Sequence, residues 1–251
     1  MIRGPLAAIA FLTRLPVGRR YVFDAKEVAR AARWFPLVGA LLGGIYAGAL
    51  WLSTPFLPPL VTATLVIALD ACLTGAMHFD GVADTADGFG GGTTRDDVLR
   101  IMRDHAIGSY GATALVLATA LKLTTIAALI DAHRALIAVA LAPALGRWAA
   151  VLLSATQPYA RADDGGKPGS AGAPSRFMGR TELLIATVTA LAFAAALARW
   201  LGLAACAAVA LAAVGWARYC RRRIGGVTGD TLGTAIVISE CLVLLLFTAA
   251  R

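Results

Sequence analysis

Long apolar stretches are the feature that most constrains how this chain can fold. Seven windows of the 251-residue sequence are long and apolar enough to cross about 30 Å of hydrocarbon as helices. These windows are residues 36–55, 58–77, 107–130, 135–155, 183–199, 200–217 and 232–250. Lipid offers no hydrogen-bond partner to an open backbone, so a chain of this kind must satisfy its backbone groups internally. The sequence therefore predicts an all-α, polytopic transmembrane helix bundle with about seven spans.

The breaks between the apolar windows are well marked, and none of them reads as a linker that would divide the chain into domains. The proline-rich segment 55–59 divides the first two windows, and Arg199 marks the boundary between the fifth and the sixth. The sequence contains no tandem repeat. We therefore expect residues 1–251 to form a single integral-membrane domain.

The distribution of basic residues predicts the orientation of the bundle. With a cytoplasmic N-terminus, the inward-facing segments hold 18 of the 23 Lys and Arg residues, and this asymmetry follows the positive-inside rule. These segments are residues 1–35, 78–106, 156–182 and 218–231. Orientation also explains the net charge of +8 better than nucleic-acid binding does, because the basic residues interrupt apolar runs and form no cluster on a soluble face. The sequence predicts a multi-pass protein of the bacterial inner membrane with a cytoplasmic-facing active site and no nucleic-acid partner.

Three carboxylates with helical spacing follow the second window. Asp80, Asp84 and Asp87 fall within roughly 60° of one another on a helix, and the glycine-rich segment 88–92 comes next. Like charges this close repel one another, so the arrangement is costly unless a cation neutralises it. Carboxylates suit Mg²⁺ or Mn²⁺, which keep several waters and also bind substrate phosphates. The spacing predicts a metal site at these three residues, and the alternative is a solvated helix face.

A short amphipathic helix after Thr94 supplies two further candidates. Asp104, at its end, either joins the metal site or hydrogen-bonds to the backbone near Gly108. Arg103 is a candidate clamp for a diphosphate, and its alternative partner is a lipid headgroup.

Ionisable residues inside the apolar windows form a second group of candidates. Asp70 and Glu240 are costly at that depth and are by default functional or paired. Arg147 is a candidate contact for a substrate anion, since a lone cation there needs a partner. Lys122 either pairs with Asp70 or Asp131 or extends its ammonium group to the membrane interface.

Three residues near the cytoplasmic ends of the windows are candidate substrate contacts. Gly229 can bring a backbone N–H close to a nucleotide phosphate. Asp230 is either a helix N-cap or a ligand of a metal or nucleotide. Arg14 is assigned to substrate binding, with a packing role as the alternative.

Several separate segments of the chain resemble the cobalamin synthase family, the adenosylcobinamide-GDP ribazoletransferases. The most specific are His78-Phe-Asp-Gly-Val-Ala-Asp-Thr-Ala-Asp-Gly88 and Thr228-Gly-Asp-Thr-Leu-Gly233, which match the HxDGxxDTxDG and TGDTLG patterns in the same order. The segments Phe11-Leu-Thr-Arg-Leu-Pro16, Ile107-Gly-Ser-Tyr-Gly111 and Tyr159-Ala-Arg161 also match. The resemblance covers essentially the whole chain.

This resemblance implies a reaction and a cofactor. α-Ribazole or its 5′-phosphate would attack the diphosphate of adenosylcobinamide-GDP, GMP would leave, and adenosylcobalamin or its 5′-phosphate would form with Mg²⁺. The acidic pattern is also similar to that of the CDP-alcohol phosphotransferases, whose spaced Asp residues hold two metals. That similarity makes Asp80, Asp84 and Asp87 the catalytic ligands, with one carboxylate as the general base. The implied partners are these small molecules and membrane lipid, and an oligomer is compatible with them.

The chain departs from the family pattern at two positions, and two other functions stay open. Val237 stands where a second acidic residue is common in the last span, and Ala106 stands where a basic residue is frequent. One alternative is a phosphotransferase acting on a CDP-activated lipid, although the missing Ala-Arg after the first acidic pair disfavours it. The other is a transporter with Asp70, Arg147 and Glu240 along its pathway, although the paired half-repeats of many transporters are missing.

Overall fold

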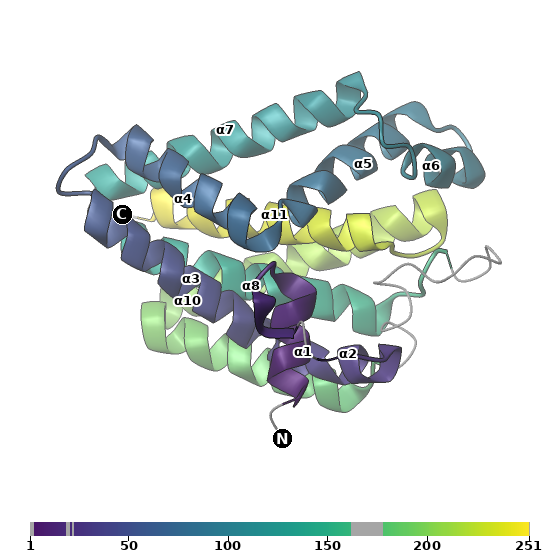
Figure 1. The fold of residues 1–251 in the computed structure, drawn as a ribbon, viewed down its shortest axis with the longest axis horizontal. Helices are drawn as coiled ribbons and strands as arrows, with labels where there is room; N and C mark the ends of the chain where they lie inside the picture. The colour runs from purple at the N-terminus through teal and green to yellow at the C-terminus, as the bar shows by residue number, and fades with distance from the viewer. Residues whose placement is uncertain (1–2, 19–20, 22, 162–177, 251) are drawn as a thin grey trace.

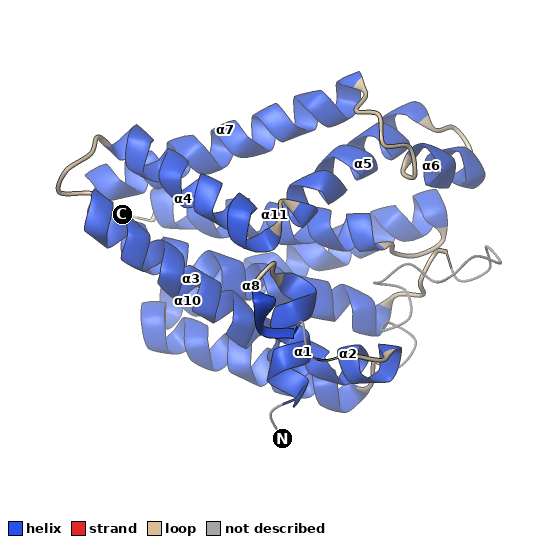
Figure 2. Cartoon of the chain, in the orientation of Figure 1, coloured by secondary structure: helices blue, strands red, loops and turns tan. Residues whose placement is uncertain are grey.

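The computed structural model describes residues 3–18, 21, 23–161 and 178–250, and its secondary structure is helical (Figure 2). In this part of the chain the only β-type pairing is one isolated bridge between Tyr159 and Val227. The helices are α1 (Arg3–Leu12), η1 (Pro16–Gly18), α2 (Ala25–Ala31), η2 (Ala32–Trp34), α3 (Phe35–Ser53), α4 (Pro59–Thr74), α5 (Met77–Gly91), α6 (Arg95–Ile101), α7 (Ser109–Asp131), α8 (Ala135–Thr156), α10 (Arg180–Ile224) and α11 (Gly229–Ala249). The predicted all-α fold is confirmed.

The helices are long and apolar enough for a multi-pass membrane protein. Among the described residues, five helical segments pass by length and composition, namely Ala25–Ser53, α7, α8, α10 and α11. α4 and α5 pass only as a pair, which is bent by 89° at the break between them (Figure 1) and would make a sixth span. The predicted bundle of membrane-spanning helices is thus confirmed, whereas the number seven stays a prediction.

The 45-residue α10 contains the predicted boundary between the fifth and sixth windows. Arg199 has φ 51° and ψ −127°, which are not helical values. A Cβ atom on Gly202 would overlap the carbonyl oxygen of Ala194. Residues eight apart in a straight helix are about 12 Å apart, so the chain reverses direction sharply at Arg199.

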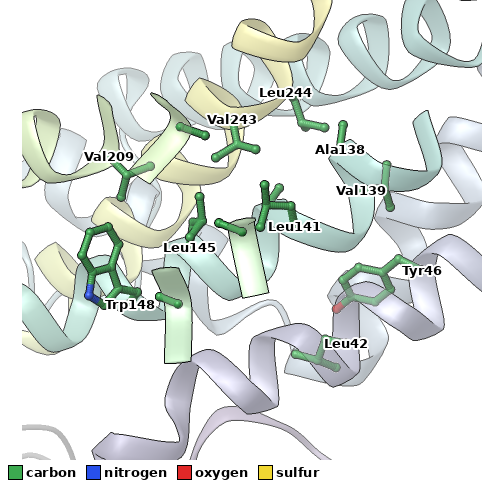
Figure 3. Packing of buried hydrophobic residues seen from close by; sticks show 14 of the residues in the cluster. Leu42, Tyr46, Ala138, Val139, Leu141, Leu145, Trp148, Val209, Val243 and Leu244 are labelled. Atoms are coloured by element: carbon green, nitrogen blue, oxygen red, sulfur yellow. The ribbon is translucent and has the colours of Figure 1, made fainter. Parts of the chain in front are cut away.

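α8 lies at the centre of the bundle, with α3, α10 and α11 packed against it (Figure 1). In α8, 83% of the apolar window is buried, compared with 33% in α7, so other helices shield α8 from lipid. Figure 3 shows how its side chains meet those of three neighbouring helices. The labelled core residues are Leu42, Tyr46, Ala138, Val139, Leu141, Leu145, Trp148, Val209, Val243 and Leu244.

Small residues let α3 approach α8 closely. A Cβ atom on Gly39 would overlap the carbonyl oxygen of Pro143, and one on Gly43 would overlap that of Ala140. Gly44 is next in sequence but faces open space. Close backbone approach at glycines is a common way for membrane helices to associate.

We expect Gly43→Ala to lower the free energy of unfolding by ~1–3 kcal/mol, because the added methyl group forces α3 away from α8. Gly44→Ala is the matched control and should be neutral or slightly stabilising, because alanine has the higher helix propensity. Thermal unfolding of the purified variants in detergent measures the difference. Equal midpoints for the two variants would contradict the close packing of α3 on α8.

The polar connections of the chain gather at one end of the bundle. The guanidinium of Arg95, at the start of α6, donates to the carbonyl oxygens of Ile224 at 3.2 Å and Ala160 at 2.6 Å. Arg223, near the end of α10, donates to the carbonyl oxygen of Phe89 at 2.6 Å. The α3–α4 and α7–α8 connections and the C-terminus lie at the opposite end (Figure 1). The fold thus separates the two sets of connections as a membrane topology requires.

Candidate active site

A cavity of about 460 Å³ lies where α1, α5, α8 and α11 meet. Asp80, Asp230 and Arg14 contribute polar groups to its lining, and Phe35 and Ile236 contribute apolar surface. A cavity with both kinds of wall suits a ligand that carries an ionic group and an apolar part.

The break between α4 and α5 directs the start of α5 into this cavity. Gly75 and Ala76 both have positive φ, 66° and 55°, which ends α4 and starts α5 in a new direction. α5 then packs against α11 at Gly81, where a Cβ atom would lie 2.6 Å from the carbonyl oxygen of Asp230. The hydroxyl of Thr234 lies 2.9 Å from the carbonyl oxygen of Gly81. The first turn of α11 is therefore held beside the carboxylates of α5.

Asp80, Asp84 and Asp230 form an acidic pocket at the end of the bundle that carries the polar connections. The carboxylates of Asp230 and Asp80, and to a smaller extent that of Asp87, lie close enough to Asp84 to repel it, and the guanidinium of Arg161 attracts it. Arg161 Nη2 donates to Asp230 Oδ2 at 2.9 Å. One guanidinium does not balance three carboxylates, so the acidic pocket favours a further cation.

The acidic pocket fits Mg²⁺ on the chemistry of its donors. No three His, Cys, Asp or Glu side chains in the described part of the chain converge closely enough to hold a metal ion by themselves. Mg²⁺, however, usually takes only one or two carboxylates and completes its shell with waters and substrate phosphates. The carboxylates of the acidic pocket suit a metal that binds together with a phosphorylated substrate.

Asp87 has backbone partners that distinguish it from Asp80 and Asp84, and its predicted role as a metal ligand stays a prediction. Its two carboxylate oxygens accept hydrogen bonds from the N–H groups of Gly108 and Gly111, both at 2.8 Å. The N-cap residue of α7 is Gly108, which has no side chain to cap the helix. The carboxylate of Asp87 therefore caps α7 from α5. Both of its oxygens are occupied, and the side chain is only 9% exposed.

Asp104 also has a backbone partner, and its predicted role as a metal ligand stays a prediction. Its side chain is exposed, and its Oδ1 accepts a hydrogen bond from the N–H of Ala106 at 3.1 Å. This is the backbone interaction that the sequence left open as an alternative. Arg103 is exposed in the turn after α6, and its contact with a substrate stays a prediction.

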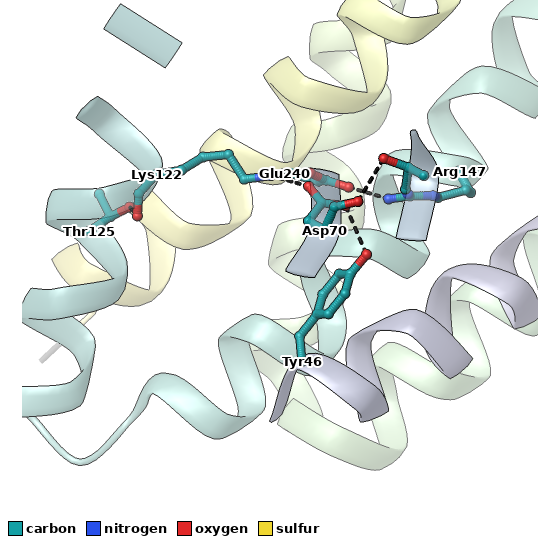
Figure 4. Close-up of polar contacts among 7 residues, drawn as sticks. Tyr46, Asp70, Lys122, Thr125, Arg147 and Glu240 are labelled. Atoms are coloured by element: carbon teal, nitrogen blue, oxygen red, sulfur yellow. Dashed lines mark hydrogen bonds and ion pairs between the residues drawn. The ribbon is translucent and has the colours of Figure 1, made fainter. Parts of the chain in front are cut away.

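Arg147 has an internal partner, and its predicted contact with a substrate stays a prediction. It is completely buried and forms an ion pair with Glu240 (Figure 4). Lys122 Nζ lies 3.0 Å from Asp70 Oδ2 and 2.8 Å from Glu240 Oε2. The hydroxyl of Tyr46 donates to Asp70 Oδ1 at 2.8 Å. We call these five residues the buried charge network.

The buried charge network identifies the partners of Lys122. Of the partners considered for Lys122, Asp70 is confirmed, and Glu240 is an addition that the sequence did not predict. The network joins α3, α4, α7, α8 and α11, and its two carboxylates balance its two cations. Pairing of this kind lowers the cost of ionised groups within a membrane bundle.

Arg161 is the candidate functional residue that the sequence prediction missed. The loop that carries it is attached to the loop before α11, because the N–H of Ala160 donates to the carbonyl oxygen of Val227 at 2.8 Å. The N–H of Val227 in turn donates to the carbonyl oxygen of Pro158 at 2.9 Å. The motif containing Arg161 was visible in the sequence, but its pairing with Asp230 was not.

The remaining predicted substrate contacts lie at the cavity. Arg14 and Gly229 both line it. The N-cap of α11 is Thr228, whose hydroxyl accepts from the N–H of Thr231, so the N-cap alternative for Asp230 is wrong. Burial raises the pKa of the nearby Tyr159 hydroxyl above its usual value, although Arg161 acts in the opposite direction, so this hydroxyl stays protonated at neutral pH.

Comparison with known proteins places the chain in a family over nearly its whole length. The family described as cobalamin-5-phosphate synthase matches residues 4–248. A relative from Ralstonia nicotianae, named adenosylcobinamide-GDP ribazoletransferase, is 42% identical over 245 residues, covering 94% of this chain and 91% of the relative. A relative of the same name from a Shewanella species is 39% identical over 249 residues, covering 96% of this chain and 92% of the relative. No solved structure matches the chain. The match of the family over residues 4–248, together with these relatives, shows that the chain belongs to the cobalamin-5-phosphate synthase family.

Proposed function

We propose that this chain transfers adenosylcobinamide phosphate from adenosylcobinamide-GDP to α-ribazole or its 5′-phosphate and releases GMP. The observation that carries the proposal is the acidic pocket, which brings Asp80 and Asp84 of α5 together with Asp230 of α11 beside a cavity of about 460 Å³. Two family motifs that are distant in sequence meet there. The relatives' name supplies the substrates, and the pocket supplies groups suited to chemistry at a diphosphate.

The reaction is a displacement at phosphorus. A ribazole hydroxyl oxygen bonds to the phosphorus atom linked to adenosylcobinamide, and the bond from that phosphorus to the GMP oxygen breaks. We assign the hydroxyl proton to Asp84, because the carboxylates of Asp230 and Asp80 and the guanidinium of Arg161 all act on it at close range. Arg161 holds Asp230 in place and adds positive charge beside the reacting diphosphate.

Mg²⁺ would take one or two of its ligands from among Asp80, Asp84 and Asp230, would complete its shell with waters and phosphate oxygens, and would neutralise negative charge on the diphosphate. Among the residues of the earlier ligand set, this proposal keeps Asp80 and Asp84. It replaces Asp87 and Asp104 with Asp230, because the first two already bind backbone N–H groups.

We further propose that the acidic pocket faces the cytoplasm of a bacterial cell and that the chain lies in the inner membrane with a cytoplasmic N-terminus. The positive-inside rule supports this orientation, since 18 of the 23 Lys and Arg residues fall in the segments that would then face inwards. Adenosylcobinamide-GDP carries a charged diphosphate and does not cross a bilayer unaided.

Removal of divalent metal tests the proposed chemistry. Purified protein in lipid vesicles should convert adenosylcobinamide-GDP and α-ribazole 5′-phosphate to a cobalamin product with added Mg²⁺, and the rate should fall to background with excess EDTA. Re-addition of Mg²⁺ should restore it, which controls for loss of protein. Full activity in EDTA would exclude the metal-dependent mechanism, and turnover of a CDP-activated lipid without turnover of the corrinoid would favour the phospholipid alternative.

The buried charge network weighs against the transporter alternative. Asp70, Arg147 and Glu240 were its predicted pathway, but they are bonded within the network. The cavity next to them measures about 20 Å³, which is about the room that one water molecule needs.

A further inference from the structure

Arg147 of the buried charge network uses only part of its hydrogen-bonding capacity. The side chain is completely buried, and its Nη1 donates to Glu240 (Figure 4). Its Nε and Nη2 atoms are buried as well, yet neither has a hydrogen-bond partner among the described residues. A guanidinium only donates hydrogen bonds. Because buried donors without a partner are costly and rare in native structures, an acceptor belongs beside these two atoms.

His78, the second residue of α5, offers an unused acceptor. Its side chain is 6% exposed, and its Nε2 has no hydrogen-bond partner in the described part of the chain. A ring nitrogen without a proton accepts a hydrogen bond. Other atoms of His78 line the cavity of the acidic pocket, but Nε2 has almost no accessible surface. This nitrogen is therefore directed into the protein and away from the cavity.

The packing of α5 and α8 on α11 brings these unused groups to the same place. A Cβ atom on Gly233 of α11 would lie 3.3 Å from the Cα atom of His78. On α8, a Cβ atom on Gly146, the residue before Arg147, would lie 3.1 Å from the carbonyl oxygen of Ile236. His78 and Arg147 thus flank the same turn of α11. Among the charged side chains, Arg147 has the largest electrostatic effect on His78.

We infer that one ordered water bridges Arg147 and His78, and that His78 thereby positions the carboxylates at the start of α5. The two side chains do not bond directly, so a mediator is needed. The water accepts from Arg147 Nε and Nη2 and donates to His78 Nε2, and about three hydrogen bonds are typical of a buried water. This inference rests on the proposed function for the role of those carboxylates and goes beyond it by naming a positioning residue.

The bridge attaches the first turn of α5 to the centre of the bundle. Asp80 lies in the same turn as His78, and Asp84 lies one turn further along. α5 starts after the 89° bend, and no side chain caps its start, so the direction of its first turn depends on the contacts of its side chains. Arg147 belongs to α8, which has the most buried apolar window of the described spans. His78 acts through the placement of the two carboxylates and does not contact substrate.

Loss of the acceptor tests this role. His78→Leu should lower kcat about 10- to 100-fold, the loss expected when catalytic groups are misplaced, while KM for both substrates stays within about twofold of wild type. His78→Gln places an amide oxygen near the position of Nε2 and should recover most of the rate. His133→Leu is the matched control and should leave kcat unchanged, because it removes an exposed imidazole at the opposite end of the bundle.

Arg147→Lys tests whether His78 acts through Arg147. Lysine keeps the positive charge beside Glu240, but it lacks the planar fork that reaches a second partner. If the water joins the two side chains, adding His78→Leu to Arg147→Lys should lower kcat by less than about twofold further. Effects that multiply would overturn the inference, and so would a His78→Gln variant as slow as His78→Leu.

A structure of the wild-type protein with ordered waters resolved needs no variant to fold. It should show a water about 2.7–3.2 Å from His78 Nε2 and from Arg147 Nε or Nη2. A direct bond between the two side chains, or no water at this place, would overturn the inference. Failure of the wild-type enzyme to convert adenosylcobinamide-GDP, with the water in place, would instead reject the proposed function.

Discussion

Asp84→Asn should lower kcat about 10²- to 10⁴-fold, the range that general acid–base groups contribute. The amide has nearly the shape of the carboxylate, but it cannot accept the proton of the ribazole hydroxyl and is a poorer ligand for Mg²⁺. The carboxylates of Asp230 and Asp80 also repel that of Asp84, so a bound cation would stabilise its charge. Removing that charge relieves repulsion in the folded protein, and we therefore expect the variant to insert and fold normally.

Two other aspartates provide the matched controls for Asp84→Asn. Asp104→Asn should keep activity close to wild type, because Asp104 is exposed and accepts a hydrogen bond only from the N–H of Ala106. Asp87→Asn should cost ~1 kcal/mol of stability by weakening the cap of α7, with turnover per folded molecule largely kept. Steady-state kinetics and circular dichroism on the same samples separate these effects. An active Asp84→Asn variant, or an inactive Asp104→Asn variant, would contradict the revised ligand set.

Lys122→Met should lower the free energy of unfolding by ~3–5 kcal/mol, the cost of breaking a buried ion pair by removing one partner. Lys122 lies 3.0 Å from Asp70 Oδ2 and 2.8 Å from Glu240 Oε2, so its loss leaves two carboxylates facing a single cation, Arg147. Thermal unfolding in detergent, followed by size-exclusion chromatography, measures the loss of folded protein. Methionine has a similar length and keeps the packing, so the charge is the main change.

Restoring the charge balance distinguishes electrostatics from packing at this position. Asp70→Asn combined with Lys122→Met leaves one carboxylate and one cation, and the Asn oxygen still accepts from Tyr46. The double variant should therefore be more stable than Lys122→Met alone. Lys26→Met removes an exposed lysine of α2 and should have little effect. A double variant that is less stable than Lys122→Met would show that charge balance does not govern this network.

The approach of α5 to α11 explains why the acidic pocket depends on more than the spacing of its carboxylates. Asp80 and Asp84 lie one turn apart, so any helix over this segment places them on one face. Helical spacing alone also places Asp87 on that face. The structure gives Asp87 partners that the other two lack, because the N-terminus of α7 approaches α5 and offers the N–H groups of Gly108 and Gly111. Which neighbour meets a helix face is a tertiary property, and here it gives backbone partners to one of three similar aspartates.

The sequence by itself determined that this chain is a bundle of membrane-spanning helices, where the chain breaks, and which family it resembles. Those properties are local, because lipid forces each apolar window to satisfy its own backbone and because Arg199 and the proline-rich segment 55–59 interrupt the helices where they stand. Only the tertiary structure decided which polar groups meet. It paired Arg161 with Asp230 and bonded Lys122 to both Asp70 and Glu240. These partners are far apart in the chain, and helical periodicity carries information over only a few turns. Their contacts therefore depend on how α5, α7 and α11 pack, which no single apolar window specifies.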